Sequence, residues 1–457
     1  MDIKTVNPTT EEMIKSYSLF SAKEINERID AAHEAYNSWR LSRFVERSEL
    51  MYVLVKLLRQ NQDDYAKLMA VEMGKPIVVG RAEIEKCAWV CEHYANAAES
   101  YLAPKSIKTE AQKSLVCYQP LGIVFAIMPW NFPFWQVFRF AAPTIMAGNG
   151  AILKHAPITT GCGEVIADLF LKAGFPKHLF QHFLLDNDKA AAVIAHEKII
   201  GVTLTGSGAA GRVVAANAAQ HLKKSVLELG GNDAYIVLAD ACIDVAARCI
   251  VASRLSNTGQ VCIAAKRIIV VHTLVKELIG RILELLPEYN LGDPLDEHTR
   301  LGPLAREDLR AKLHAQVLES QRLGAKILVG GEIPNRRGYY YPPTILTNVS
   351  PGMPAFDEEL FGPVISITIA DNEKEAIQLA NQSQYGLGSA VFTKDLKRGE
   401  QIATNEIEAG ACFVNGVVTS DPRLPFGGIK ESGFGRELSQ EGILEFMNIK
   451  TVVIRDE

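Results

Sequence analysis

Cys262 is the residue of this sequence best placed for nucleophilic chemistry. It ends the polar, glycine-containing segment 256–262 and precedes an apolar stretch, a position where a cysteine can be exposed in a cleft. A thiolate at such a position would be the nucleophile. Cys262 is one of eight cysteines, and most cysteines are small buried hydrophobic residues, so its interpretation depends on other segments.

Two polar residues elsewhere could act on a substrate held by that thiol. Glu228 ends an apolar run and is followed by glycines at 230 and 231, which would let another group approach the backbone closely. Asn131 lies between Pro129 and Pro133, whose fixed φ angles would hold its amide as an oxyanion donor. Each feature also has an ordinary structural explanation, because glycine pairs form turns and asparagine often caps a helix.

A glycine-rich turn could bind phosphate. Gly206, Ser207 and Gly211 follow the predicted strand 199–204 and open the predicted helix 208–222. Backbone N–H groups and the dipole at a helix N-terminus favour an anion. The spacing differs from GxGxxG, so the turn alone is weak evidence for a nucleotide.

These groups need a scaffold, and the pattern of apolar residues predicts one. A helix is expected to begin at the capping box of Ser21 and Glu24. Its apolar face would comprise Ile25, Ile29, Ala32, Tyr36 and Trp39. Predicted strands are 123–128, 151–153, 199–204, 226–229, 235–238, 267–271, 364–369, 390–392 and 412–414. Because helical stretches alternate with these runs, we expect parallel βαβ units in two α/β lobes.

Length and composition narrow the classes of function. A chain of 457 residues exceeds one ordinary hydrophobic core, so two large lobes and a smaller part are expected. A formal charge of −5 lacks the basic excess of a nucleic-acid binder. The scattered cysteines and the absence of a secretory signal favour the reducing cytoplasm. Cys87 and Cys91 could share a helix face, but no second pair at ligand spacing accompanies them, so they are interpreted as buried thiols and no metal is expected.

The segment 114–138 contains no charged residue and therefore requires a test for a membrane span. Three prolines, Gly122 and Asn131 interrupt it and would leave backbone groups unpaired in lipid. Buried strands and a turn are the better interpretation, and no membrane partner is expected.

Together with segments 359–364 and 425–433, the four motifs above resemble those of the aldehyde dehydrogenase superfamily. The six motifs occur in the family's order over nearly the whole chain. The resemblance implies an α/β fold of two doubly wound parallel-sheet lobes, a Rossmann-like cofactor domain and a catalytic domain, plus a small β element. The cofactor domain would comprise 1–101 and 121–230, the catalytic domain 231–439, and the oligomerisation strands 102–120 and 440–457. Strands of that kind would be unsatisfied in a monomer, which implies a homodimer or homotetramer.

The resemblance also assigns catalytic roles. Cys262 matches the nucleophile that forms a thiohemiacetal, and the Asn131 amide with the backbone N–H of Cys262 matches the oxyanion donors. Glu228 matches the base that activates water against the thioester remaining after hydride transfer. The implied reaction is oxidation of a small aldehyde to a carboxylic acid with NAD or NADP.

The resemblance also implies a set of cofactor-binding residues in this sequence. They are Met128, Pro129, Trp130, Lys154, Gly206, Ser207, Gly211, Leu229, Glu359 and Phe361. Glu359 matches the residue that binds the nicotinamide ribose, and Lys154 the lysine at the adenine ribose. Pro157 stands where NAD-preferring members often carry glutamate, so NADP should be tolerated.

Arg139 and Ser420 resemble residues of succinate-semialdehyde dehydrogenases, whose substrate carries a carboxylate at its far end. The other predicted lining residues of the aldehyde tunnel are Phe132, Trp135 and Phe426. A buried guanidinium needs an anion, which could be the substrate carboxylate or an acid of the chain itself. That subgroup usually has a second arginine at the position of Ser256, and some members have a redox-active cysteine at the position of Ala264.

Three other functions fit parts of the sequence. A CoA-acylating semialdehyde dehydrogenase would transfer the acyl group to CoA, but such members generally lack the base at the position of Glu228. A dehydrogenase for another short aliphatic aldehyde would share the catalytic residues. A non-catalytic binding protein is disfavoured because Cys262, Glu228 and Asn131 occur together.

Overall fold

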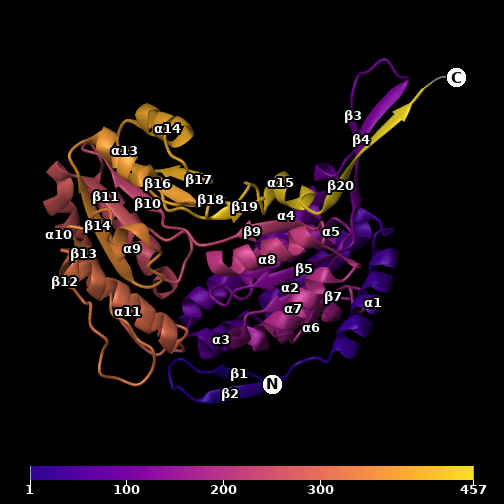
Figure 1. Cartoon of the computed structure of the whole chain (residues 1–457), viewed down its shortest axis with the longest axis horizontal. Helices are drawn as coiled ribbons and strands as arrows, with labels where there is room; N and C mark the ends of the chain where they lie inside the picture. Colours follow the sequence, from indigo (N-terminus) through magenta and orange to yellow (C-terminus); the bar gives the residue numbers. More distant parts are fainter. Residues whose placement is uncertain (1, 456–457) are drawn as a thin grey trace.

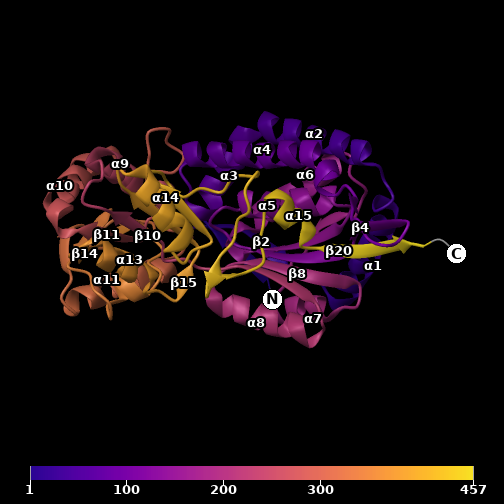
Figure 2. The same ribbon diagram turned by 90° about the horizontal axis from the view of Figure 1, so that it is seen from above.

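The computed structural model describes residues 2–455 and forms two lobes, each built around one large sheet (Figure 1, Figure 2). The first lobe has six strands in the order β19-β9-β8-β5-β6-β7. Its parallel strands are β5 (Ile123–Met128), β6 (Gly150–His155), β7 (Phe180–His182), β8 (Ile199–Thr205) and β9 (Lys224–Glu228). The short strand β19 (Gly433–Phe434) pairs antiparallel with β9.

Helices connect the parallel strands in turn. They are α5 (Trp135–Met146), α6 (Thr160–Lys172), α7 (Asn187–Ala195) and α8 (Gly208–Gln220). Alternate residues of β5 pack in two different cores: Val124 and Ala126 belong to one, and Ile123 and Phe125 to the other. Helices therefore cover both faces of the sheet, and the predicted doubly wound arrangement is confirmed.

Four helices precede this sheet. They are α1 (Ala22–Trp39), α2 (Phe44–Gln60), α3 (Gln62–Met73) and α4 (Ile77–Tyr101). The predicted capping box at α1 is confirmed, since Ser21 Oγ accepts from the Glu24 N–H at 3.2 Å and the Glu24 carboxylate accepts from the Ser21 N–H at 2.7 Å. All five residues of its predicted apolar face are buried.

The second lobe has seven strands in the order β12-β13-β14-β11-β10-β16-β17. They are β10 (Ala234–Val237), β11 (Arg267–Val271), β12 (Lys326–Val329), β13 (Thr344–Thr347), β14 (Val364–Ala370), β16 (Gly388–Phe392) and β17 (Ala411–Val414). Only β12 and β13 pair antiparallel. The covering helices are α9 (Ile243–Leu255), α10 (Val275–Leu285), α11 (Glu307–Arg322), α13 (Glu373–Asn381) and α14 (Leu396–Asn405).

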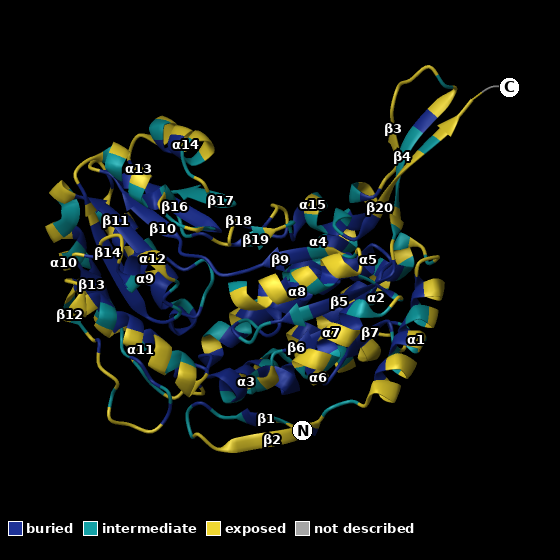
Figure 3. Cartoon of the chain, in the orientation of Figure 1, coloured by how far each residue is buried: buried dark blue, intermediate teal, exposed yellow. Residues whose placement is uncertain are grey.

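A three-stranded arm extends from the first lobe. In it β20 (Met447–Ile454) pairs antiparallel with β4 (Lys113–Pro120), which also pairs with β3 (Lys105–Ser106). The arm projects away from both lobes (Figure 1, Figure 3). Apolar side chains of β20 are exposed on it, including Ile449 and Val453. Helix α4 continues through Tyr101, and strands β3 and β4 follow within segment 102–120.

No helix within residues 2–455 is long and apolar enough to cross a membrane. The uncharged segment 114–138 instead forms β4, β5 and the start of α5. In the same part of the chain, no group of three or more His, Cys, Asp or Glu residues could hold a metal ion. Cys87 and Cys91 are buried on α4.

Candidate active site

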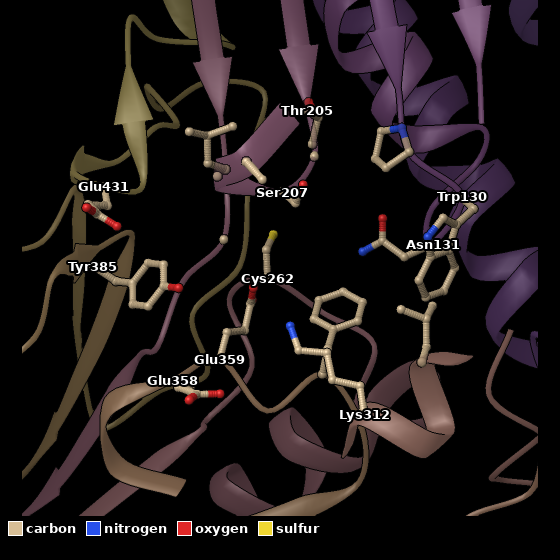
Figure 4. A pocket seen from close by; sticks show the side chains of 18 of the residues that line it. Trp130, Asn131, Thr205, Ser207, Cys262, Lys312, Glu358, Glu359, Tyr385 and Glu431 are labelled. Carbon is tan, nitrogen blue, oxygen red and sulfur yellow. The ribbon is translucent and has the colours of Figure 1, made fainter. Parts of the chain in front are cut away.

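The carboxyl ends of parallel strands meet at one edge of a sheet, and there the first lobe faces the second. The cavity between the lobes has a volume of about 620 Å³. Nine of the predicted site residues line it: Pro129, Trp130, Asn131, Gly206, Ser207, Leu229, Cys262, Glu359 and Phe361 (Figure 4). Elements far apart in the sequence thus bring the candidate nucleophile and the glycine-rich turn into one site.

Cys262 lies on a strained loop between α9 and β11. Asn257 and Thr258 have positive φ angles of 48° and 56°, and Gly259 follows at 74°. Non-glycine residues rarely adopt this conformation and need surrounding contacts to hold them there. A Cβ atom on Gly259 would lie 2.2 Å from the Gly362 carbonyl, so only glycine fits. The loop is therefore fixed by its neighbours and not by local preference.

Asn131 and that loop hold each other through reciprocal hydrogen bonds. The Asn131 amide donates to the Gln260 carbonyl at 3.0 Å, and the Asn257 amide donates to the Asn131 carbonyl at 2.8 Å. The Asn131 side chain is 5% exposed and points toward Cys262 across the cavity (Figure 4). Asn131 does not cap α5, whose N-cap residue is Phe134. This geometry suits an amide that donates to an oxyanion at Cys262.

Lys266 connects the nucleophile loop to the cofactor side of the cavity. Its ammonium donates to the Cys262 carbonyl and pairs with Glu359 at 2.9 Å. A Cβ atom on Gly230 would lie 2.4 Å from the Glu359 carboxylate, and one on Gly231 would lie 2.7 Å from the Cys262 carbonyl. Both glycines therefore permit the close approach that the sequence suggested.

Burial is the main influence on the pKa of the Cys262 thiol. Desolvation raises its pKa to about 11, and the positive charges of Lys266 and Arg139 oppose that rise. The carboxylates of Glu359 and Glu228 raise it further. Thiolate formation therefore depends on the local cations and on a proton acceptor nearby.

Glu228 ends β9 and is 2% exposed. Burial raises the pKa of its carboxyl well above the usual range, while Arg139 lowers it and Glu437 raises it. A carboxyl group shifted upward in this way can exchange protons closer to neutral pH than an exposed glutamate. Its Oε1 atom is buried without a hydrogen-bond partner in the described structure, and Glu228 is not among the residues that line the cavity.

The turn after β8 has the features of a phosphate site. Ser207 caps α8 by accepting from the Ala210 N–H at 3.3 Å, and the first residues of the helix line the cavity. Gly211 has a different role, because a Cβ atom there would lie 2.6 Å from the Leu229 side chain. It allows α8 to pack closely on the segment that follows β9. Lys154 and Met128 are buried near the ends of β6 and β5, outside the residues that line the cavity.

The structure places Arg139 in an internal ion pair. Its guanidinium pairs with Glu437, lies 4.7 Å from the centre of the Phe426 ring and donates to Thr205 Oγ1 at 3.3 Å. Arg139 is 1% exposed. The charge is thus compensated within the chain, which is the alternative that the sequence left open.

The other predicted tunnel residues are not among the residues that line the cavity. Trp135 and Phe426 belong to one large hydrophobic core, and Phe132 and Cys262 pack against it. Ser420 is 6% exposed and accepts a hydrogen bond from Lys86 at 2.8 Å.

Comparison with known proteins places this geometry in a family. Residues 1–452 match the model of the aldehyde dehydrogenase family. The chain belongs to the aldehyde dehydrogenase family. The resemblance identified from the six motifs is thereby confirmed, as is the two-lobed α/β fold.

Two curated relatives match over almost their full length. A Synechocystis protein named "probable succinate-semialdehyde dehydrogenase", for NADP(+), is 46% identical over 454 residues, which cover 99% of this chain and 100% of the relative. The Escherichia coli succinate semialdehyde dehydrogenase Sad, for NAD(P)+, is 44% identical and covers 98% of this chain and 97% of its own. The solved succinic semialdehyde dehydrogenase of Streptococcus pyogenes in complex with NADP+ is 34% identical, with a TM-score of 0.97 and coverage of 99% and 100%.

The motifs did not predict the roles of Lys266, Asn257 and Glu437. Lys266 and Asn257 lie within the same segment as Cys262, so a lysine four residues after the cysteine and a polar residue before the glycine were the available signals. Glu437 had no such signal, because its partner Arg139 lies in the other half of the chain.

Proposed function

We propose that this aldehyde dehydrogenase oxidises succinate semialdehyde to succinate with NADP+ or NAD+. The observation that supports the reaction is the single cavity that holds the Cys262 thiol, the Asn131 amide, the N-terminus of α8 and Glu359. The substrate assignment is supported by the names of the relatives given above.

Different side chains of the protein carry out different steps of the reaction. The Cys262 thiolate attacks the aldehyde carbon, and the Asn131 amide with the Cys262 backbone N–H donates to the resulting oxyanion. A bound nicotinamide would supply the hydride acceptor, and the acyl group would then remain on Cys262 as a thioester. Glu228 then takes a proton from water, which attacks the thioester and releases the acid.

The residues present fit a nicotinamide dinucleotide. The N-terminus of α8 with Ser207 would hold the pyrophosphate, and Glu359, which lines the cavity beside Phe361, would hold the nicotinamide ribose. Lys154 would meet the adenine ribose. Pro157 adds no carboxylate that would repel a 2′-phosphate, which supports use of NADP.

We also infer that the enzyme works in the cytoplasm as a homodimer or homotetramer. The eight cysteines are all free, as expected in a reducing compartment. The exposed edge of β20 in the arm could be covered by a second copy. The division into a cofactor domain, a catalytic domain and oligomerisation strands at the boundaries given above remains a prediction.

The test is an assay of NAD(P)H absorbance with succinate semialdehyde and with uncharged aldehydes of similar length, each with and without CoA. We expect the highest kcat/KM for succinate semialdehyde, no dependence on CoA, and succinate as the product. A requirement for CoA would establish the acylating alternative. A preference for the uncharged aldehydes would contradict the proposed substrate.

A further inference from the structure

Three buried or half-buried cations lie around the predicted aldehyde tunnel, and they differ in their partners. Lys75 pairs with Glu83, and Arg139 pairs with Glu437. Lys86, on α4, forms no ion pair with any carboxylate among residues 2–455; it donates to the Ser420 hydroxyl at 2.8 Å instead. Its ammonium also lies 4.4 Å from the centre of the Trp135 ring. An enclosed ammonium with only a neutral hydroxyl and an aromatic ring as partners is a site for an anion.

We propose that Lys86, together with Ser420, binds the distal carboxylate of the substrate. The assignment rests on the proposed function, because it presupposes an aldehyde with a carboxylate at its other end. Ser420 is the hydroxyl predicted from the sequence to contact that carboxylate. Lys86 supplies the positive charge for this contact, because the charge of Arg139 is already paired with Glu437.

The position of Lys86 relative to the reactive thiol supports this role. Trp135, whose ring lies beside the ammonium, belongs with Phe426 to the large hydrophobic core against which Phe132 and Cys262 pack. Arg139 acts electrostatically on both Lys86 and Cys262, and its guanidinium lies 4.7 Å from the centre of the Phe426 ring. A short substrate could thus place its aldehyde at the thiol and its carboxylate at the ammonium.

The helix that carries Lys86 is held firmly against the nucleophile side of the lobe. Glu83, on the same helix, accepts from the backbone N–H groups of Phe134 and Trp135 at 2.9 Å each. These bonds fix α4 to the N-cap and the first residue of α5, three and four residues after Asn131. The ammonium is therefore prepositioned, which lowers the entropic cost of binding the carboxylate.

The charge of Lys86 titrates in an accessible range. Burial and, to a lesser extent, the positive charge of Arg139 lower its pKa to about 8, against the opposing effect of Cys87, Glu83 and Asp421. Below this pH the ammonium attracts a carboxylate, and above it the attraction is lost. The kcat/KM reports the free enzyme, so selectivity for the anionic substrate should fall as the pH rises through about 8.

The experiment compares succinate semialdehyde with its methyl ester, which has nearly the same shape and no charge. In Lys86→Met we expect kcat/KM to fall by about 100-fold for succinate semialdehyde and by less than about threefold for the ester. Lys86→Arg, which keeps the charge, should retain much of the selectivity. In the wild type the ratio of the two kcat/KM values should decrease above about pH 8, and in Lys86→Met it should be flat. Taking the ratio cancels the titration of Cys262, which acts on both substrates.

Two results would overturn the assignment. If Lys86→Met keeps the wild-type selectivity, or loses both substrates by the same factor, then Lys86 has a structural role and the proposed function stands without it. If the wild type itself does not prefer the charged substrate, the proposed substrate and the role of Lys86 both fail. Activity of the variants on the ester reports that they are folded.

Discussion

Replacement of Arg139 by methionine distinguishes an internal ion pair from a substrate contact. Arg139 and Glu437 are 1% and 5% exposed, and the pair lies beside Glu228. Methionine keeps much of the side-chain volume beside Phe426 but leaves the Glu437 carboxylate buried without its cation. Breaking a buried pair by removing one partner costs about 3–5 kcal/mol, so we expect a loss of stability of that size.

The loss should depend on pH in a defined direction. Burial already raises the pKa of Glu437, and Arg139 is the group that lowers it, so the variant raises it further. The folded variant then retains a proton that the unfolded chain has released above its own pKa of about 4.3. Stability of the variant should therefore fall, relative to the wild type, as the pH rises from the folded pKa of Glu437 in the wild type to its higher folded pKa in the variant, by at most about 1.4 kcal/mol per pH unit.

The assay is urea unfolding followed by fluorescence and circular dichroism at several pH values. The double variant Arg139→Met/Glu437→Gln removes both charges and should recover most of the lost stability. In the single variant, activity on charged and uncharged aldehydes should fall together. The reasoning is refuted if the single variant loses less than about 1 kcal/mol and its kcat/KM falls only for succinate semialdehyde, because Arg139 would then bind the substrate.

Two further predictions concern the nucleophile. Asn131→Ala should lower kcat by about 100-fold, equivalent to about 3 kcal/mol, because it removes one oxyanion donor. Asn131→Asp should not restore activity. If steady-state kinetics show an unchanged kcat in the alanine variant, the amide acts only in fixing the loop. Lys266→Met should raise the pKa of the Cys262 thiol, because Lys266 is the leading group that lowers it. At pH 9, the rate of alkylation of Cys262, followed by peptide mapping, should then be about tenfold lower in Lys266→Met than in the wild type. The rate in Lys266→Arg should stay near that of the wild type. An unchanged alkylation rate in the methionine variant would contradict the electrostatic role of Lys266.

Regular elements with a simple pattern could be predicted from the sequence. The predicted strands 123–128 and 267–271 coincide with β5 and β11, and α1 begins at its capping box. No helix is predicted within segment 44–101, which forms α2 to α4. Helix α4 packs against α2, α3 and α5, and its buried residues include the charged Glu83, which interrupts an otherwise apolar pattern.

The candidate site also contains parts that the sequence could predict and parts that it could not. Motifs with a fixed local spacing led to Cys262, Glu228, Asn131 and the turn at Ser207, because each occupies a strand end or loop that the pattern locates. The charge partners could not be predicted. Whether Arg139 meets a substrate or Glu437, and whether Lys86 is paired, depends on contacts between segments far apart in the chain.

The central claim is that the acyl group is carried by Cys262 and released with the help of Glu228. Glu228→Gln should transfer hydride but stall before hydrolysis, because hydride transfer precedes the step that needs the base. After this variant is mixed with succinate semialdehyde and NADP+, we expect one equivalent of NADPH and one succinyl group on Cys262 by mass spectrometry of the intact protein and its peptides. Cys262→Ser, treated in the same way, should show neither. NADPH formation without an adduct, or an adduct on another cysteine, would contradict the account.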